Sequence, residues 1–320
     1  MKEEQDMPNK ENRPYSLEGK QAFVTGASKG LGEQISLGLL KQGVHVIGTS
    51  RSGPPESFKT YIDQGHASYE LGDLAQNNRQ ILEDINKKYG GYEIFINNAG
   101  AFSPDYFMRL DPDIIAREIN LDLVVPLLLH RQWFELYNKL HPNVKVPELS
   151  VNICSISSFY AWPGGTAYQA AKTGLSASLA GLRSMEKYLE EEASEETKQK
   201  IGPVAQIHPR IVAIYPDNVD TGLIARAQQD SLYQVEGNSL PMEIVTDTIL
   251  KAIEGKDNFG KFDDIAILVN PRDPQTQSEL KGVYLAFIPP DNETHRPDFG
   301  DRILEKIAGE DVLIKRGVYK

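Results

Sequence analysis

The stretch Thr25-Gly-Ala-Ser-Lys-Gly-Leu-Gly32 decides the fold of this 320-residue chain. Residues 20–25 form a short apolar run typical of a buried strand. In the segment after the stretch, Ile35, Leu39 and Leu40 recur at helical spacing. A strand, a glycine-rich turn and a helix in this order are the context that a dinucleotide-binding site requires.

The three glycines of this stretch have separate tasks in such a site. Gly26 permits the tight turn, Gly30 lets the backbone approach a pyrophosphate, and Gly32 allows the helix to pack closely on the strand. The first N–H groups of the helix then face the phosphates. A second strand is predicted over residues 44–49, at the interval expected of a strand–helix–strand unit.

The end of that second strand indicates which dinucleotide is bound. A free ribose 2′-hydroxyl usually meets Asp or Glu there, whereas Thr49-Ser50-Arg51 supplies no carboxylate and one cation. Lys29, inside the glycine turn, supplies a second cation. Because arginine binds phosphate through a forked set of donors, we expect NADP(H) to be preferred over NAD(H). The alternative is that Arg51 is an ordinary surface cation.

A second pattern, further along the chain, predicts proton transfer. Tyr168 and Lys172 are four residues apart and share a face if the segment is helical, and Ser155 precedes the tyrosine by thirteen residues. A nearby ammonium lowers the pKa of a phenol from its ordinary ~10, so Tyr168 is expected to be tuned toward neutral pH. It then exchanges a proton with a reacting oxygen that Ser155 holds. The alternative is a solvated helix face.

The order of the motifs strengthens this interpretation. The glycine stretch is followed by Asp73-Leu74, by Asn97-Asn-Ala-Gly100 after a strand over 93–96, by Asn120 in Glu-Ile-Asn-Leu, and by Ser155 and Tyr168-x-x-x-Lys172. With these motifs at these spacings, the chain resembles the short-chain dehydrogenase/reductase family over roughly residues 17–270.

The resemblance implies an NADP(H)-dependent oxidoreductase of the carbonyl reductase type, which transfers a hydride between nicotinamide and a carbonyl or secondary alcohol. It implies that Tyr168 is the proton donor or acceptor, that Lys172 lowers its pKa and contacts the nicotinamide ribose, and that Ser155 orients the carbonyl. Asn120 would position a water that connects Lys172 to solvent. The implied cofactor contacts are Gly26, Ser28, Lys29, Gly30, Leu31, Gly32, Ser50, Arg51, Asp73, Leu74, Asn98, Ala99, Gly100, Tyr168, Lys172, Pro216, Val219 and Thr221.

One residue departs from the family pattern near the nicotinamide. Asp217 follows Pro216 where the family usually has glycine, so a carboxylate lies near the hydride-transfer region or points to solvent. Val219 and Thr221 keep the rest of the pattern. A non-catalytic dinucleotide-binding sensor or scaffold, disabled by Asp217, therefore stays open as an alternative function.

Alternating strands and helices predict the architecture. Strands are expected at 20–25, 44–49, 67–71, 93–96, 149–154, 210–215 and 264–269, with a helix near 76–89 and another that begins at Pro112 and is capped by Asp111. This is an α/β fold, a single-domain, Rossmann-like, doubly wound parallel sheet of about seven strands with an extra C-terminal segment.

The domain boundaries follow from the same pattern. We expect a disordered N-terminal tail at 1–16, the main domain at 17–271, and a C-terminal extension at 272–320. The extension, with a short amphipathic helix pattern at 302–308, is expected to pack on the domain or on a neighbouring subunit. Residues 186–202 lengthen the connection after the Tyr168 helix, and their acidic part, 186–196, is interpreted as a solvated helical face.

Charge and composition exclude several classes of partner and site. With 34 Lys and Arg against 45 Asp and Glu, the net charge of −11 disfavours nucleic acid and anionic membranes as partners. The longest apolar stretch, 121–129, is interrupted by Asp122 and Pro126 and is too short to cross a bilayer.

The single cysteine, Cys154, lies in a buried-strand pattern and suits a reducing compartment. The histidine spacing predicts no metal site, and no signal peptide is apparent, so a cytoplasmic protein is expected.

The substrate pocket is the least determined part of the site. Phe159-Tyr-Ala-Trp162, Ala101-Phe102 and the segment 222–241, with Leu223, Ile224, Leu232 and Tyr233, predict a partly apolar pocket with aromatic walls around a small-molecule carbonyl or alcohol. Ordinary loop packing of these aromatic residues is the alternative. Because the family is usually oligomeric, a homo-oligomer, dimer or tetramer, is also expected.

Overall fold

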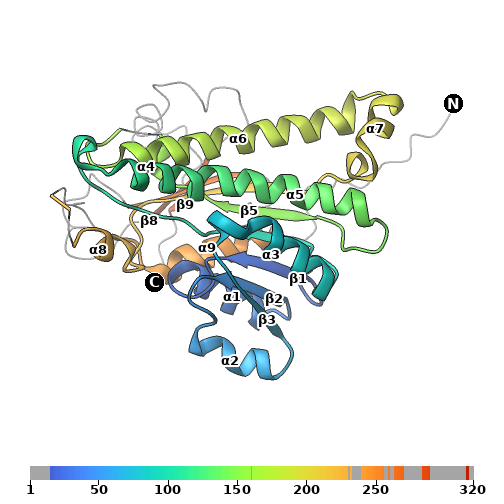
Figure 1. Ribbon diagram of the computed structural model, residues 1–320, viewed down its shortest axis with the longest axis horizontal. Helices are drawn as coiled ribbons and strands as arrows, with labels where there is room; N and C mark the ends of the chain where they lie inside the picture. Colours follow the sequence, from blue (N-terminus) through green and yellow to red (C-terminus); the bar gives the residue numbers. More distant parts are fainter. Residues whose placement is uncertain are drawn as a thin grey trace.

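The structure, a computed structural model, describes residues 15–159, 161–229, 231–232, 239–255, 259, 263–269, 283–288 and 315–316. In these residues one nine-stranded sheet, ordered β3-β2-β1-β4-β5-β6-β7-β8-β9, runs through the molecule with helices on both faces (Figure 1). The strands are β1 (Gln21–Thr25), β2 (His45–Ser50), β3 (Ala67–Leu71), β4 (Ile94–Asn97), β5 (Leu149–Ile153), β6 (Arg210–Pro216), β7 (Asp264–Val269), β8 (Val283–Ile288) and β9 (Lys315–Arg316).

The first seven strands are parallel, and each lies within one or two residues of its predicted range. The strand order reverses between β1 and β4, so the carboxyl ends of these two strands open onto the crevice where ligands bind in doubly wound sheets. The predicted α/β, doubly wound fold is confirmed.

The C-terminal segment adds two strands that the sequence analysis did not predict. β8 pairs antiparallel with β7 over its full length, from Val283↔Val269 to Ile288↔Asp264, and β9 pairs with β8. The expected N-terminal tail, up to residue 14, and the helix expected at 302–308 lie outside the described residues. Tyr15 belongs to the domain, because its amide donates to the Glu254 carbonyl.

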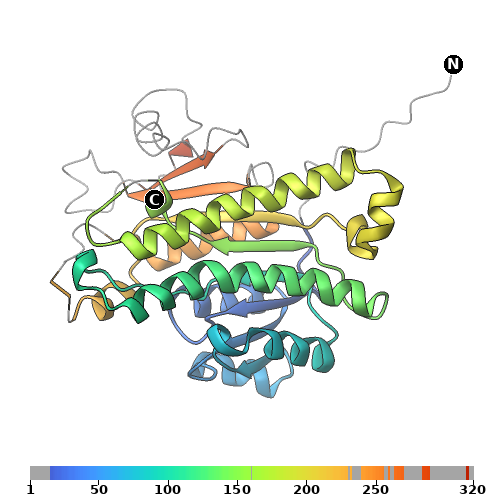
Figure 2. The ribbon, with the colours of Figure 1, turned by 45° about the horizontal axis from the view of Figure 1, so that its top comes forward.

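The helices cover the two faces of the sheet in two groups. α1 and α9 pack together on one face, while α3, α5 and α6 cover the other (Figures 1 and 2). The helices are α1 (Gly30–Lys41), α2 (Glu56–Asp63), α3 (Leu74–Tyr89), α4 (Pro112–Ile119), α5 (Val125–Leu140), α6 (Thr166–Glu191), α7 (Glu195–Ile201), α8 (Leu223–Ala227) and α9 (Met242–Glu254).

Strand alternation divides the apolar residues between two cores. On β1, Ala22 and Val24 join the core beneath α1 and α9, whereas Phe23 points to the opposite face and stacks on Phe95 with ring centres 5.8 Å apart. Successive side chains of a strand point to opposite faces, so a strand buried on both sides reads as a continuous apolar run. The burial of this strand fixes the position of the glycine turn that follows it.

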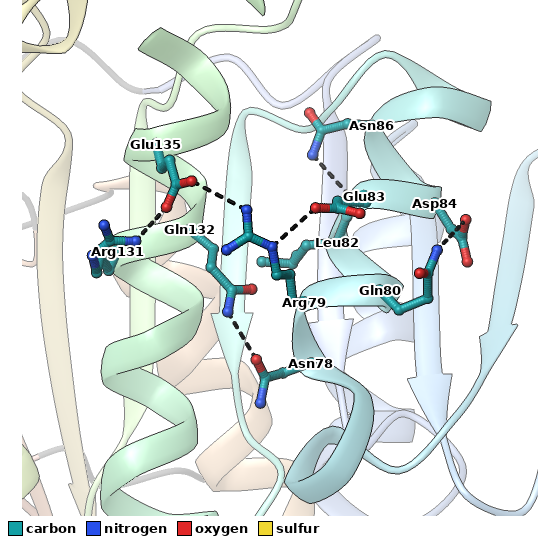
Figure 3. A network of polar contacts seen from close by, with 10 residues as sticks. All are labelled: Asn78, Arg79, Gln80, Leu82, Glu83, Asp84, Asn86, Arg131, Gln132 and Glu135. Atoms are coloured by element: carbon teal, nitrogen blue, oxygen red, sulfur yellow. Dashed lines mark hydrogen bonds and ion pairs between the residues drawn. The ribbon is translucent and has the colours of Figure 1, made fainter. Parts of the chain in front are cut away.

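A polar network joins α3 to α5 on the outside of the second core (Figure 3). Arg79 on α3 donates to Glu83 at 3.0 Å and to Glu135 on α5 at 3.2 Å, and Gln132 donates to Asn78 at 2.8 Å. Exposed ion pairs of this kind contribute little to stability. Their consequence is geometric, because they hold α5 against the helix that Asp73 begins.

The acidic segment after the Tyr168 helix differs from its prediction. α6 continues to Glu191, beyond the sheet, and packs on residues 203–206, so Glu186 is buried rather than solvated. Its carboxylate lies 3.2 Å from His208 Nδ1, and burial raises the pKa of Glu186 to about 7. The remaining acidic residues of the run, such as Glu191, are exposed. Among the acidic residues of 186–196, the prediction of a solvated helical face was therefore wrong at Glu186 alone.

Candidate active site

The glycine turn forms the floor of the site. Gly26 and Gly30 adopt φ angles of +67° and +58°, which side chains with a Cβ rarely tolerate. A Cβ on Gly32 would overlap the Gly26 carbonyl and the Asn98 amide, so the start of α1 is in backbone contact with the turn. The first turn of α1 therefore presents its free N–H groups to the crevice.

Thr25, at the end of β1, connects this turn to the Asn97–Gly100 segment. Its buried hydroxyl accepts hydrogen bonds from the amides of Asn98 and Ala99, both at 2.9 Å. The Asn98 side chain donates back to the Thr25 carbonyl at 3.0 Å. The carboxyl ends of β1 and β4 are thus tied into one rigid edge.

The far end of the crevice carries the residues predicted to select the nucleotide. Asp73 caps α3 by accepting from the Ala75 amide at 3.0 Å, and Ser50 accepts from the Tyr69 hydroxyl at 2.6 Å. Lys29 and Arg51 are exposed, and within the described part of the chain neither makes an ion pair. Both cations are therefore available to an anionic ligand.

These elements enclose one elongated cavity of about 660 Å³. All but two of the predicted site residues line it, namely Gly26, Ser28, Lys29, Gly30, Leu31, Ser50, Arg51, Asp73, Leu74, Asn98, Ala99, Gly100, Ser155, Tyr168, Lys172, Pro216, Val219 and Thr221. The two exceptions are Gly32, which packs beneath the turn, and Asn120. Residues that span almost two hundred positions of the sequence thus line the same cavity.

Ser155, Tyr168 and Lys172 meet in this cavity. Ser155 follows β5 directly, while Tyr168 and Lys172 lie on successive turns of α6, with Lys172 Nζ 5.6 Å from the centre of the phenol ring. Lys172 is 5% exposed and donates to the Ile153 carbonyl at 2.9 Å. Ser155 Oγ donates to Ser157 Oγ at 3.2 Å and acts to lower the pKa of Tyr168, so the three side chains form the group that the spacing predicted.

The proton affinity of Tyr168 differs from the expectation. Burial raises the pKa of the phenol above its ordinary value, and the lowering by Lys172 is the smaller effect. The Asp122 carboxylate opposes Lys172 and raises the pKa further. The prediction of a phenol tuned toward neutral pH counted the lysine charge and omitted burial, which acts in the opposite direction.

Asn120 is placed beside the group rather than within it. It begins a π-helical turn, Asn120–Val124, between α4 and α5, and its Nδ2 donates to the Ala75 carbonyl at 3.3 Å. Such turns occur frequently at functional sites. In this structure the turn directs another side chain at the lysine.

That side chain is Asp122, which the sequence analysis did not include in the site. Its Oδ1 lies 3.0 Å from Lys172 Nζ, and its Oδ2 accepts from the Ala101 amide at 2.8 Å. Asp122 is 1% exposed and lines the cavity. The available signal was a carboxylate that interrupts the apolar run 121–129, because a charge in a buried helix needs a partner.

Asp217 is held by its own loop. Its amide donates to the Ile267 carbonyl on β7 at 2.8 Å, and its Oδ1 accepts from the Asn218 amide at 2.8 Å. The residue lines the cavity together with Pro216 and Asn218. The loop that follows reaches the glycine turn, where Thr221 lies against Gly30.

One wall of the cavity is aromatic, as predicted in part. Phe102 packs edge-on against Tyr168, with ring centres 4.9 Å apart, and lies 5.9 Å from the Trp162 ring. Leu223 and Ile224 also line the cavity. Phe159 instead packs against Tyr215 in the core, at 4.6 Å, because its loop turns inward after Ser155. Leu232 is 65% exposed, and Tyr160 and Tyr233 lie outside the described residues.

Three other expectations concern metal, thiol and membrane chemistry. Within the described ranges, no three His, Cys, Asp or Glu side chains are grouped to hold a metal ion. Cys154 is buried, and burial raises the pKa of its thiol to about 12, as expected of a packing residue. Among the helices that the structure describes, none combines the length and the apolar character needed to cross a membrane.

Comparison with known sequences points to one family. A family model described as short chain dehydrogenase matches residues 20–230. The 3-oxoacyl-[acyl-carrier-protein] reductase of Vibrio harveyi is 30% identical over 162 residues, which cover 50% of this chain and 64% of the relative. Benzil reductase ((S)-benzoin forming) of Bacillus subtilis is 31% identical over 155 residues, 48% of this chain and 62% of the relative. The matches thus span somewhat less than two thirds of these relatives.

Comparison with solved structures supports the fold. A short chain dehydrogenase from Burkholderia cenocepacia, solved in complex with NADP, superposes with a TM-score of 0.59 at 19% identity, covering 79% of this chain and 89% of that one. A short-chain dehydrogenase from Sphingobium yanoikuyae, in complex with NADPH, gives 0.56 at 18% identity, with coverages of 72% and 83%. At such identities the likeness shows a shared fold.

Proposed function

The chain belongs to the short-chain dehydrogenase family, and on that premise we propose that it is an NADP(H)-dependent oxidoreductase acting on a carbonyl or secondary alcohol. The observation that carries the proposal is the meeting of Ser155, Tyr168 and Lys172 in the same cavity as the glycine turn. A proton donor and a dinucleotide site in one cavity are the two parts that such a reaction needs.

The residues present fit a dinucleotide. A Cβ on Gly26 would come within 2.9 Å of the Asn98 side chain, so the glycine turn packs closely on the Asn97–Gly100 segment and both line the cavity. The amino end of α1 and the Thr25-linked edge provide N–H groups for a pyrophosphate. Asp73 and Leu74, at the start of α3, line the same cavity and would hold the adenine.

Preference for NADP(H) rests on the two cations. Lys29 and Arg51 line the same cavity, and the strand that ends at Ser50 supplies no carboxylate to a ribose hydroxyl. An unpaired guanidinium gains more from a 2′-phosphate than from a hydroxyl, because charge-assisted hydrogen bonds are the stronger ones. Two relatives in fold were solved with NADP or NADPH, which is consistent with this preference.

The chemistry divides between the cofactor and the side chains. The bound nicotinamide supplies or accepts the hydride. Ser155 hydrogen-bonds the carbonyl oxygen, and Tyr168 gives that oxygen its phenolic proton, leaving an alcohol and a phenolate. Lys172 stabilises the phenolate until a proton from solvent restores the phenol.

The substrate is proposed to carry an apolar or aromatic group beside its carbonyl. Phe102 and Trp162 form a wall next to Tyr168, and Leu223 and Ile224 line the same cavity. An aromatic substituent packs favourably against such rings in edge-to-face or offset contact. The name of the Bacillus subtilis relative, a reductase of benzil, is consistent with a substrate of this kind.

The decisive experiment measures NADPH oxidation with a panel of aliphatic ketones, aromatic diketones, aldehydes and quinones. We expect turnover of at least one aromatic carbonyl compound. Tyr168→Phe should lower its rate on the order of 10²–10⁴-fold while NADPH binding is retained. Tight NADPH binding without oxidation across the panel would contradict an enzymatic function.

We also propose that the protein forms a homodimer through α5 and α6. These helices lie side by side on one face of the molecule (Figure 2). Their outer sides expose large apolar residues, namely Val124 and Leu128 in and after the π-turn, and Met185 and Tyr188 on α6. Exposed apolar groups along these two helices are consistent with an interaction surface.

A further inference from the structure

The Lys172 ammonium is part of a buried ion pair. It lies 3.0 Å from Asp122 Oδ1, and the two side chains are 6% and 0% exposed. The Ala101 amide fixes the other carboxylate oxygen, and the Ile153 carbonyl accepts from the ammonium. Ile153 ends β5, Lys172 lies on α6 and Ala101 lies in the segment that follows β4, so three separate parts of the fold hold the pair.

A second carboxyl group stands next to the pair. Glu118 lies four residues before Asp122, at the end of α4, and is 1% exposed. Its Oε1 is buried without a hydrogen-bond partner among the described residues. Burial raises the pKa of Glu118 to about 7, and the charge of Asp122 adds to this rise. Lys172 is therefore close to two acidic side chains, Asp122 and Glu118, as well as to the Tyr168 phenol.

We propose that Asp122 is a positioning residue that holds the Lys172 ammonium and keeps the Tyr168–Lys172 pair fully protonated, so that the site is set for carbonyl reduction. The inference rests on the proposed function. In reduction the phenol O–H bond breaks as a new O–H bond forms on the substrate oxygen, while the carbonyl carbon takes up the hydride that NADPH would supply. The protonated pair is the form that starts this step.

The physical reason is the negative charge of the Asp122 carboxylate beside the Lys172 ammonium. A carboxylate beside two groups that lose protons makes each proton harder to remove. Although burial lowers it, the pKa of Lys172 lies above its ordinary value because of Asp122, and Asp122 likewise raises the pKa of Tyr168. Since the two groups titrate as a coupled pair, losing Asp122 lets the first proton leave at lower pH, whichever group releases it.

The other groups near the pair act on it in different directions. Cys154, after β5, has a thiol pKa of about 12 and stays neutral over the working range. Ser155 stabilises the phenolate and so acts in the opposite direction. Glu118 acts in the same direction as Asp122 once it ionises.

The test compares wild type, Asp122→Asn and Asp122→Ser by two measurements. The first is kcat/KM for NADPH-dependent reduction of an aromatic diketone such as benzil as a function of pH. The second is the ultraviolet titration of tyrosinate in the NADP-bound protein, taken as the difference from the same protein carrying Tyr168→Phe. In both variants, the pH at which kcat/KM for reduction falls on the alkaline side should decrease by about one unit. The first deprotonation of the Tyr168–Lys172 pair, followed by tyrosinate absorbance, should move to lower pH by the same amount.

Asp113→Asn is the matched control, because it removes an exposed carboxylate from α4, the helix that leads into the π-turn of Asp122, and should leave the profile in place. Glu118→Gln should give a smaller shift in the same direction. A profile that is unchanged in both Asp122 variants while circular dichroism shows a native fold, or that moves to higher pH, would overturn the proposal.

The two proposals fail separately. If no carbonyl compound is reduced, the proposed function fails, but the tyrosinate titration still tests Asp122. If reduction occurs and neither readout moves, only the role of Asp122 fails. Asp122→Ser, which keeps an acceptor for the Ala101 amide, serves where Asp122→Asn does not fold.

Discussion

Gly100 lies directly against Asp122: a Cβ built on Gly100 would come within 2.6 Å of Asp122 Oδ1 and 3.7 Å of Lys172 Nζ. The glycine that ends the Asn97–Gly100 segment thus makes room for the buried ion pair. Substituting either residue should therefore affect the other.

Gly100→Ala should lower the free energy of unfolding by about 1–3 kcal/mol, because overpacking a filled site displaces fixed side chains. In an Asp122→Ser background the shorter side chain removes the clash, so Gly100→Ala should lower the free energy of unfolding by less. Urea unfolding of the four proteins of this cycle measures the difference. Equal costs in both backgrounds would show that the two residues are not in contact.

Arg51→Asp should weaken NADPH binding by about tenfold or more and leave NADH binding little changed, since only the former offers a 2′-phosphate. Isothermal titration of each nucleotide gives the ratio. Arg131→Ala, which removes an exposed cation from α5 outside the cavity, is the control. A parallel loss of both affinities would indicate that Arg51 does not recognise the phosphate.

Thr25→Val should destabilise the protein by about 1–3 kcal/mol for each amide left without its acceptor. The amides of Asn98 and Ala99 lose their shared hydroxyl while the volume of the side chain is kept. NADPH affinity should also fall, because this edge faces the cavity. Thr25→Ser keeps the hydroxyl and should restore both properties; failure of this rescue would point to packing instead.

Glu118 gives a pH dependence of stability whose sign can be worked out. Its pKa rises from 4.5 in the unfolded chain to about 7 in the folded one, so between these values the folded state binds the extra proton. Stability contributed by this group is present below pH 4.5 and is lost as pH rises through 7, up to about 3 kcal/mol. The loss between pH 5 and pH 8 should be smaller in Glu118→Gln than in wild type, as measured by urea unfolding. An identical loss in both proteins would place the ionised Glu118 in a solvated site.

Leu128→Glu should convert the proposed dimer to monomer, because it buries a charge in an apolar contact. Sedimentation velocity measures the oligomeric state of this variant and of Leu71→Glu, which introduces the same charge at an exposed position of β3. The comparison tests the two surfaces against each other. Retained NADPH binding by both variants shows that they fold. Dimers that survive Leu128→Glu would mean that α5 is not the interface.

The sequence predicted those parts of the site that depend on local geometry. A glycine turn between strand and helix, and two side chains four residues apart on a helix, keep their relation in almost any packing, so Gly26, Gly30, Tyr168 and Lys172 were found where expected. The motif order predicted the parallel sheet for the same reason, because each strand–helix pair is a local unit.

The parts that were missed depend on residues distant in the chain. Asp122 acquires its role from the π-turn and from α6, fifty residues later, and no spacing rule connects the two. The high pKa of Tyr168 depends on burial, which a motif does not report. Glu186 is buried only because α6 extends past the sheet to meet residues 203–206.

The antiparallel pairing of β8 with β7 has a consequence for how copies of this chain associate. A strand at the rim of a sheet presents unpaired amides and carbonyls that recruit a strand from another molecule. Here the chain's own segment 283–288 occupies that rim along all six residues of β7. The seventh parallel strand is thereby closed to pairing with a strand of another subunit, and the rim of the sheet on this side passes to β8 and the short β9, which pairs with only two residues of β8.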